Sequence, residues 1–338
     1  MTYKQVMSNR KYVGLGHVPV GIGAVLKGWD IEECHYRNTA RLPVVNFRAM
    51  TEACPHNCPH CFTEKKKKTL KIAEIKNIID QLAEARTHAI DFVGEGEPTI
   101  DPDFFTIIEY TASRGIHPVI YTDAATRFRE TEFIKRVYES GASVSPKCDS
   151  LFNEDYQNWV VGDKQGNYFR QRNEAIDFLI ASGFNKVQAD GTTRLGFDMV
   201  VSKRNMDEVE KTLRYCRENN LWIIFTFYLP SGKSARDNFD FTLAVDDVDK
   251  VTISKIVKTV DEEYFFFHGG WNNLLTTPCI EFLQICGDGG VTACVGNENL
   301  IGNIRDTSIK KLEERILKTY PVHDRANFDG NCPYRSAI

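Results

Sequence analysis

Short apolar runs alternate with amphipathic segments through the central part of the chain. Between about residues 43 and 230, six strand-like runs are separated by stretches whose apolar residues recur at helical spacing. The first of these stretches, 69–85, places Leu70, Ile75, Ile78, Ile79 and Leu82 on one helical face. The strand candidates are 42–50, 89–94, 117–122, 142–148, 196–202 and 221–230, and the later helix candidates begin near 103 and cover 130–140, 173–182 and 206–219.

This alternation predicts an α/β fold built on parallel strands. Strand–helix–strand units of this length pair their strands in parallel through right-handed crossovers. Six such units predict a partial (β/α)6 barrel, TIM-like but open. In such sheets the active site lies in the loops that follow the carboxyl ends of the strands.

The alternation stops after about residue 236. A helix candidate at 246–263 is followed by two β-like arms around the glycine-rich turn at 287–290, which indicates a hairpin. We therefore expect an N-terminal extension over 1–42, a barrel over 43–235 and a small α+β module over 236–338.

Composition places the chain among globular proteins. Of its 338 residues 42% are hydrophobic and 26% charged, and the net charge of −4 does not indicate a strongly polyanionic partner such as a nucleic acid. The four lysines at 65–68 are interpreted as a solvated approach to a helix. No run of about 18 apolar residues and no secretory signal pattern is present, so a cytoplasmic protein without a membrane partner is expected.

The ten cysteines indicate metal or redox chemistry, because a chain this long can build a core without disulfides. Cys34, Cys148 and Cys216 stand alone, as small buried hydrophobic residues do. The other seven form two groups, namely Cys54, Cys58 and Cys61, and Cys279, Cys286, Cys294 and Cys332.

The first group has the spacing C-x3-C-x2-C, directly after the first predicted strand. Three thiolates on one short loop can hold three corners of an iron–sulfur cube and leave the fourth iron open. A zinc ion would need a fourth ligand, for which His56 or His60 would have to serve. We favour iron–sulfur over zinc.

This motif in this position resembles the radical S-adenosylmethionine (SAM) superfamily. The resemblance implies that Cys54, Cys58 and Cys61 bind a 4Fe-4S cluster whose open iron takes the amino and carboxylate groups of SAM. It further implies that one electron, supplied by a flavodoxin- or ferredoxin-type donor, cleaves SAM to methionine and a 5'-deoxyadenosyl radical. That radical would abstract a hydrogen atom from the substrate.

Further motifs extend the resemblance. The stretch "VGEGEPTI" is similar to the family's glycine–glutamate–proline motif, although Glu95 stands where many members have a second glycine. His60 takes the place of an aromatic residue beside adenine, and "YTDA" the place of a threonine–asparagine–glycine turn, with a purely structural turn as the alternative. The residues that the resemblance assigns to cofactor binding are His60, Gly94, Glu95, Gly96, Glu97, Thr122, Asp123, Lys147 and Asp149.

The fourth strand, "SVSPKCDSL", is similar to a family strand in which a serine contacts SAM and an aspartate follows two residues on; Lys147 takes the place of the serine, and Asp149 matches the aspartate. Because side chains alternate along a strand, these two should face the barrel interior and Cys148 the helices. We interpret Cys148 as a packed residue. A catalytic role as hydrogen-atom donor is the alternative.

The second cysteine group resembles the SPASM and Twitch extensions of radical SAM proteins. Cys279, Gly289 and Cys294 have the spacing C-x9-G-x4-C, and a strand–turn–helix pattern follows at 300–312. The resemblance implies one auxiliary 4Fe-4S cluster on Cys279, Cys294 and Cys332, with Cys286 as a fourth ligand or, instead, an open iron. A zinc knuckle is the alternative.

The sequence therefore predicts a radical SAM enzyme whose auxiliary cluster assists electron transfer or substrate binding. The substrate is expected to be a small molecule or a peptide, and the reaction an oxidation, an epimerisation, or the formation or cleavage of a carbon–heteroatom bond. Two alternatives stay open: a radical SAM enzyme that modifies RNA, and a non-catalytic zinc-binding interaction protein.

Overall fold

The computed structural model describes residues 44–188, 193–228, 231–234, 239–264, 283–294 and 297–320. Each of the six predicted strands is confirmed by a strand inside its predicted range. In chain order they are β1 (Val44–Phe47), β2 (Ala89–Phe92), β3 (His117–Thr122), β4 (Ser143–Pro146), β5 (Gly196–Val201) and β6 (Trp222–Phe227).

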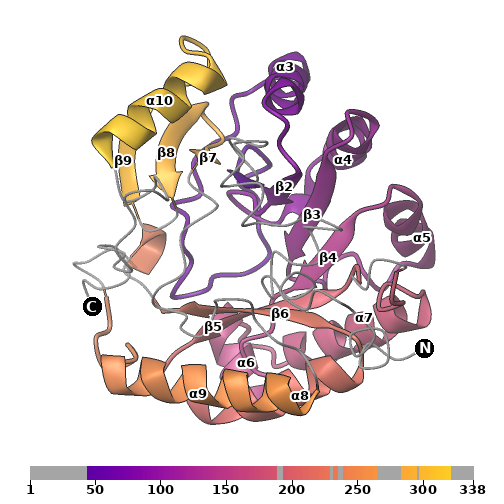
Figure 1. Ribbon diagram of the computed structural model, residues 1–338. Coiled ribbons are helices and arrows are strands. Elements are labelled where there is room, and N and C mark those ends of the chain that lie inside the picture. The colour runs from indigo at the N-terminus through magenta and orange to yellow at the C-terminus, as the bar shows by residue number, and fades with distance from the viewer. Residues whose placement is uncertain are drawn as a thin grey trace.

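All six strands run parallel, in the order in which they follow one another along the chain. β1 to β4 form one continuous set of neighbours, and β5 pairs with β6. Bridges from Val144 to Leu195 and from Lys147 to Asp198 join β4 to β5. The strands therefore form a curved arc that stays open, with the helices outside it (Figure 1).

The helices follow the strands as predicted, with one addition. The helices between β1 and β6 are α3 (Ile72–Glu84), α4 (Phe104–Ser113), α5 (Thr131–Glu139), α6 (Glu154–Val161), α7 (Tyr168–Ala181) and α8 (Val209–Glu218). Three single turns of 3-10 helix are η1 (Pro98–Ile100), η2 (Met206–Glu208) and η3 (Gly232–Ser234). In α3 the predicted face, Ile75, Ile78, Ile79 and Leu82, is buried. Figure 1 places α3, α4 and α5 outside β2, β3 and β4.

Two helices, α6 and α7, stand where one was predicted. α6 is capped at its N-terminus by Asn153, whose side-chain oxygen accepts a hydrogen bond from the amide of Tyr156, and at its C-terminus by Gly162, which has a φ of 71°. α7 then begins at Tyr168, earlier than predicted, because the carboxylate of Asp163 accepts from the amides of Asn167 and Tyr168 at 2.7 Å each.

The C-terminal strands extend the barrel's own sheet. β7 (Gln284–Ile285) pairs in parallel with β1, on the edge that β2 leaves free. β8 (Gly290–Cys294) and β9 (Asn297–Asn303) follow in antiparallel pairing, and α10 (Ile309–Thr319) lies against β9. The predicted hairpin and the strand–turn–helix pattern are confirmed, as is the helix at 246–263, which is α9 (Asp247–Glu263).

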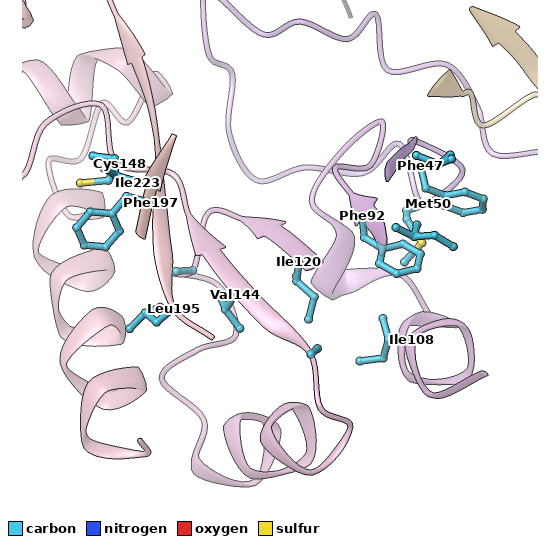
Figure 2. Packing of buried hydrophobic residues seen from close by; sticks show 14 of the residues in the cluster. Phe47, Met50, Phe92, Ile108, Ile120, Val144, Cys148, Leu195, Phe197 and Ile223 are labelled. Carbon is cyan, nitrogen blue, oxygen red and sulfur yellow. The ribbon is translucent and has the colours of Figure 1, made fainter. Parts of the chain in front are cut away.

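The hydrophobic core lies between the strands and the surrounding helices (Figure 2). Phe47 and Phe92, on neighbouring strands, meet edge to face with ring centroids 5.5 Å apart. This core packing supports the strand ends, so the loops that leave them can position reactive groups.

Across the described residues no helix combines the length and the apolar character needed to cross a membrane.

Candidate active site at the carboxyl ends of the strands

The loop after β1 carries Cys54, Cys58 and Cys61, each half-buried and free of disulfides. Backbone hydrogen bonds fix this loop to three neighbouring segments. The amides of Gly96 and Glu97 donate to the loop at 2.8 Å each, the loop's Asn57 amide donates to the end of α6 at 3.0 Å, and the Lys233 amide donates to Cys61 at 2.9 Å.

Two glycines allow the close approach of these segments. A Cβ atom on Gly96 would lie 2.1 Å from the carbonyl oxygen of Ala53, and one on Gly232 would lie 2.2 Å from the carbonyl carbon of Phe62. Such distances exclude any side chain at either position. The glycine in the middle of "GEGEP" is therefore required by the packing of the cysteine loop.

Burial disfavours the charged thiolate form of two of these cysteines. It raises the pKa of Cys54 to about 11 and that of Cys58 to about 12, while the His56 amide and Lys65 lower the first, and Lys147 the second, by less. A bound metal would supply the positive charge that stabilises the thiolates. Such a site fits iron, whose clusters take thiolate ligands.

The nearby histidines are committed to other partners. His56 lies 2.8 Å from a carboxylate oxygen of Asp123, and His60 lies 3.2 Å from the ammonium of Lys147. Within the ranges given above, no three histidine, cysteine or acidic side chains, the three thiols included, converge on a single metal ion. The loop offers three thiols as donors, and their ligation of a cluster stays a prediction.

Glu97 ties the loop after β2 to the end of β3. Its carboxylate is buried and accepts hydrogen bonds from the hydroxyls of Thr99 (2.6 Å) and Thr122 (2.7 Å), and from the amide of Asp123 (2.8 Å). Burial, followed by the charge of Asp123, raises the pKa of Glu97 to about 8, although those hydrogen bonds lower it. Two buried carboxylates whose charges interact in this way favour a cation beside them.

Lys147, Asp149 and His60 meet at the end of β4. The Lys147 ammonium lies 2.8 Å from Asp149, and the His60 ring 3.6 Å from the same carboxylate oxygen. Burial raises the pKa of Asp149, but Lys147 and then His60 lower it by more, so that it lies well below its ordinary value. Burial and the adjacent Lys147 lower the pKa of His60.

Cys148 faces away from this cluster. It is fully buried in the hydrophobic core, beside Phe197 and Ile223 (Figure 2). Burial raises the pKa of its thiol to about 11. The alternation along β4 thus separates Cys148 from Lys147 and Asp149 as predicted, and the packing favours a structural role over hydrogen-atom donation.

The second cysteine group is described only in part. Cys286 is buried in the turn between β7 and β8, and Cys294 ends β8. Cys279 and Cys332 lie outside the described residues. The auxiliary ligand set stays a prediction.

Sequence reasoning missed Arg48, which is the partner of Glu95. Its guanidinium lies 2.7 Å from the Glu95 carboxylate, and both side chains are shielded from solvent. A charged residue at the end of an apolar strand is the signal that could have found it. Gly94, in the same loop as Glu95, has a φ of 67° and makes the turn that β2 needs here.

The loops after β1, β2, β3 and β4 thus bring the predicted cofactor residues to one edge of the sheet. Residues 49–216 match the family model described as the radical SAM superfamily. Among curated proteins, the chain is 26% identical over 317 residues to the AdoMet-dependent heme synthase of Methanosarcina barkeri, covering 84% of this chain and 85% of that protein. It is 22% identical over 194 residues to the mycofactocin maturase MftC of Mycobacterium tuberculosis, covering 54% of this chain and only 44% of that protein.

Solved structures share the fold at low sequence identity. A structure of anSMEcpe with bound AdoMet and the Cp18Cys peptide aligns with a TM-score of 0.62 at 17% identity, covering 86% of each chain. Streptococcus suis SuiB bound to its precursor peptide SuiA aligns with a TM-score of 0.62 at 14% identity, covering 87% of this chain and 69% of that one. These structures show a shared fold. The family match over the cysteine loop and the strands that support it shows that the chain belongs to the radical SAM superfamily.

Proposed function

We propose that this chain is a radical SAM enzyme whose 4Fe-4S cluster is held by Cys54, Cys58 and Cys61. When bound, this cluster supplies the electron that cleaves SAM to methionine and the 5'-deoxyadenosyl radical, which takes a hydrogen atom from the substrate. A flavodoxin- or ferredoxin-type protein would deliver the electron. The observation that carries the proposal is the fastening of the three-thiol loop onto the Gly96–Glu97 segment by two backbone hydrogen bonds of 2.8 Å.

The residues of the chain would bind and orient SAM. Glu97 and Asp123 form the buried acidic pair whose charge a bound ammonium group would balance. Thr122 holds the Glu97 carboxylate in place from β3. The amino end of SAM would thus lie beside the loops after β2 and β3.

The end of β4 would support the adenine side of the site. His60 precedes Cys61, and its ring is fixed by Lys147 at 3.2 Å and by Asp149 at 3.6 Å. The ring of Tyr228, just after β6, meets it edge to face with centroids 6.1 Å apart. An imidazole held on two sides offers a flat face against which a purine can stack.

We further propose that residues 236–338 form a SPASM- or Twitch-like module with one auxiliary 4Fe-4S cluster, after a barrel over 43–235 and an extension over 1–42. The ligands would be Cys279, Cys294 and Cys332, with Cys286 as the fourth candidate. The hairpin of β7 and β8 and the β9–α10 unit support the module, because both follow the predicted pattern. The cluster would accept or donate an electron, or help to bind the substrate.

The proposed substrate is a peptide or a small molecule bound at the carboxyl ends of the strands. A relative named as a mycofactocin maturase and a structural neighbour bound to its precursor peptide support a peptide. A relative named as a heme synthase, aligned over 84% of this chain, supports a small molecule. The reaction class is left open among oxidation, epimerisation and bond formation or cleavage.

The central test is anaerobic reconstitution followed by an assay for 5'-deoxyadenosine. The wild-type chain should become brown and air-sensitive and should cleave SAM, whereas Cys58→Ala should yield no 5'-deoxyadenosine. Cys216→Ala is the matched control, because this thiol is fully buried in the core, on α8. SAM cleavage by Cys58→Ala would overturn the proposal.

RNA modification is tested separately by a mobility-shift assay. Binding that disappears between low and physiological salt would be nonspecific contact with phosphates. Retained, sequence-dependent binding at physiological salt would favour the RNA alternative over a peptide or small-molecule substrate.

A further inference from the structure

The turn of the β7–β8 hairpin docks onto the segment that leaves the cysteine loop. The carbonyl of Gly287 accepts hydrogen bonds from the amides of Thr69 at 2.9 Å and Leu70 at 3.3 Å. A Cβ atom on Gly287 would lie 3.2 Å from the carbonyl oxygen of Lys66 and 3.3 Å from Cγ of Glu95. The hairpin that contains Cys286 is therefore in direct contact with both the cysteine loop's exit and the loop after β2.

One carboxylate joins these segments to β1. Oε2 of Glu95 accepts from the Arg48 guanidinium at 2.7 Å and from the Lys66 amide at 3.2 Å. Oε1 accepts from the Gly287 amide at 3.4 Å, a long hydrogen bond. Glu95 thus contacts the end of β1, the cysteine loop's exit and the hairpin turn at once.

The same residue reaches back toward a cysteine of the first group. The carbonyl oxygen of Glu95 accepts a hydrogen bond of 2.7 Å from the hydroxyl of Thr63. That hydroxyl lies 3.3 Å from Sγ of Cys61. A continuous path of contacts therefore runs from Cys61 through Thr63 and Glu95 to Gly287, the neighbour of Cys286.

Burial makes the Glu95 carboxylate sensitive to the position of the hairpin turn. A buried carboxylate is costly unless a cation pairs with it and hydrogen-bond donors satisfy its remaining lone pairs. Arg48 supplies the cation, but two of the donors are backbone amides that are in reach only while the hairpin turn and residue 66 stay in place. A glycine at position 95, as in many members of the family, could make none of the side-chain contacts.

We propose that Glu95, held by Arg48, is a positioning residue that couples the Cys286 hairpin to the Cys54–Cys61 loop. Movement of the hairpin then displaces the Glu95 carboxylate, and through Thr63 this changes the surroundings of Cys61. A structural change at one cysteine group would by this route alter the surroundings of the other. The proposal goes beyond the radical SAM function and can be tested in the chain without any cluster.

The first experiment is hydrogen exchange measured by mass spectrometry on the full chain without clusters. Glu95→Gln should speed exchange at least about tenfold in peptides that cover both 283–294 and 61–70. Should Glu95→Gln fold poorly, the double variant Arg48→Met/Glu95→Met removes the charges together, keeps the apolar volume and should show the same loss of protection. The control is Glu208→Gln. Glu208 is a buried carboxylate of η2 that accepts a 2.7 Å hydrogen bond from Ser150 in the loop after β4.

The second experiment measures the electronic surroundings of the cluster in the Cys54–Cys61 loop. In reconstituted protein that also carries Cys279→Ala and Cys294→Ala, Glu95→Gln should alter the electron paramagnetic resonance spectrum of the reduced cluster, and Glu95→Asp should restore part of the wild-type spectrum. Glu208→Gln should leave that spectrum unchanged. The coupling would be overturned if hydrogen exchange at 283–294 in the Glu95 variants kept the wild-type rate. It would equally be overturned if Glu95→Gln left the electron paramagnetic resonance spectrum unchanged.

Discussion

The ammonium of Lys147 lies 2.8 Å from Oδ2 of Asp149, and the Asp149 side chain is fully buried. Oδ1 of the same carboxylate accepts a 2.8 Å hydrogen bond from the Val200 amide. The pair therefore fastens the end of β4 to β5, where the two parts of the barrel sheet are joined only by isolated bridges among the described residues. It also contacts the ring of His60, a residue of the cysteine loop.

Lys147→Met should strongly destabilise the chain. The substitution leaves the Asp149 carboxylate buried without its cation, which typically costs about 3–5 kcal/mol. We expect the free energy of unfolding in urea, measured anaerobically on the chain without clusters, to fall by that amount.

Lys203→Met provides the comparison, because Lys203 pairs with Asp246 at 3.0 Å on the surface. Removal of an exposed pair should cost less than about 1 kcal/mol. Equal losses in the two variants would contradict a structural role for Lys147 as the cation of the buried Asp149 carboxylate.

Gly96→Ala should displace the cysteine loop. Its Cβ atom would lie 2.1 Å from the carbonyl oxygen of Ala53, so the backbone must shift. Overpacking of this kind costs about 1–3 kcal/mol, and we expect iron uptake and SAM cleavage to fall together with stability. Iron counting and 5'-deoxyadenosine formation are the measurements.

Gly115→Ala is the matched control for Gly96→Ala. Gly115 has a φ of 77°, but an added Cβ would meet no atom within 4 Å. The variant should lose about 1 kcal/mol to backbone strain and should still take up iron. Loss of iron in this control as well would mean that the effect at Gly96 reflects general instability.

Cys148→Ala tests the catalytic alternative for this thiol. Because Cys148 is packed in the core behind β4, we expect a modest loss of stability, of about 1 kcal/mol, with product formation preserved once the substrate is known. A hydrogen-atom donor would behave differently, since SAM cleavage would continue while the product changed or vanished. Mass spectrometry of the product distinguishes the two.

The auxiliary cluster is tested by iron content. Two 4Fe-4S clusters require about eight irons per chain, and one requires about four. We expect about eight in the reconstituted wild type and about four in Cys279→Ala/Cys294→Ala, with 5'-deoxyadenosine formation retained by that variant. About four irons in both proteins would exclude the auxiliary cluster.

The strands and most helices followed from the sequence because local periodicity encodes them. β1 to β6 lie in mainly apolar runs, and α3, α5 and α8 have one apolar face each. Each of these elements can therefore be predicted from its own residues. α6 was not predicted. Its buried residues include the polar Gln157 and Asn158, so its eight residues show no clear apolar face. Its boundaries depend on the Asn153 cap and on Gly162.

The contacts of Glu95 could not be predicted from the sequence. Its place in "VGEGEP" marked it as a departure from the family motif. Its partner, Arg48, lies 47 positions earlier, and their contact depends on β1 and β2 being neighbours. The contact with Gly287 spans 192 positions and depends on where the hairpin docks. No local pattern contains that information.

The residue pattern encodes the alternation that makes the sheet parallel, and it places the three-cysteine loop directly after the first strand. It does not encode that β7, only two residues long, adds to the free edge of β1 and so carries the Cys286 turn to Glu95. The reason is physical. Periodicity fixes which face of a strand is buried, whereas the backbone groups on a strand edge are alike for every sequence, so which strand pairs there is settled only when distant segments pack together.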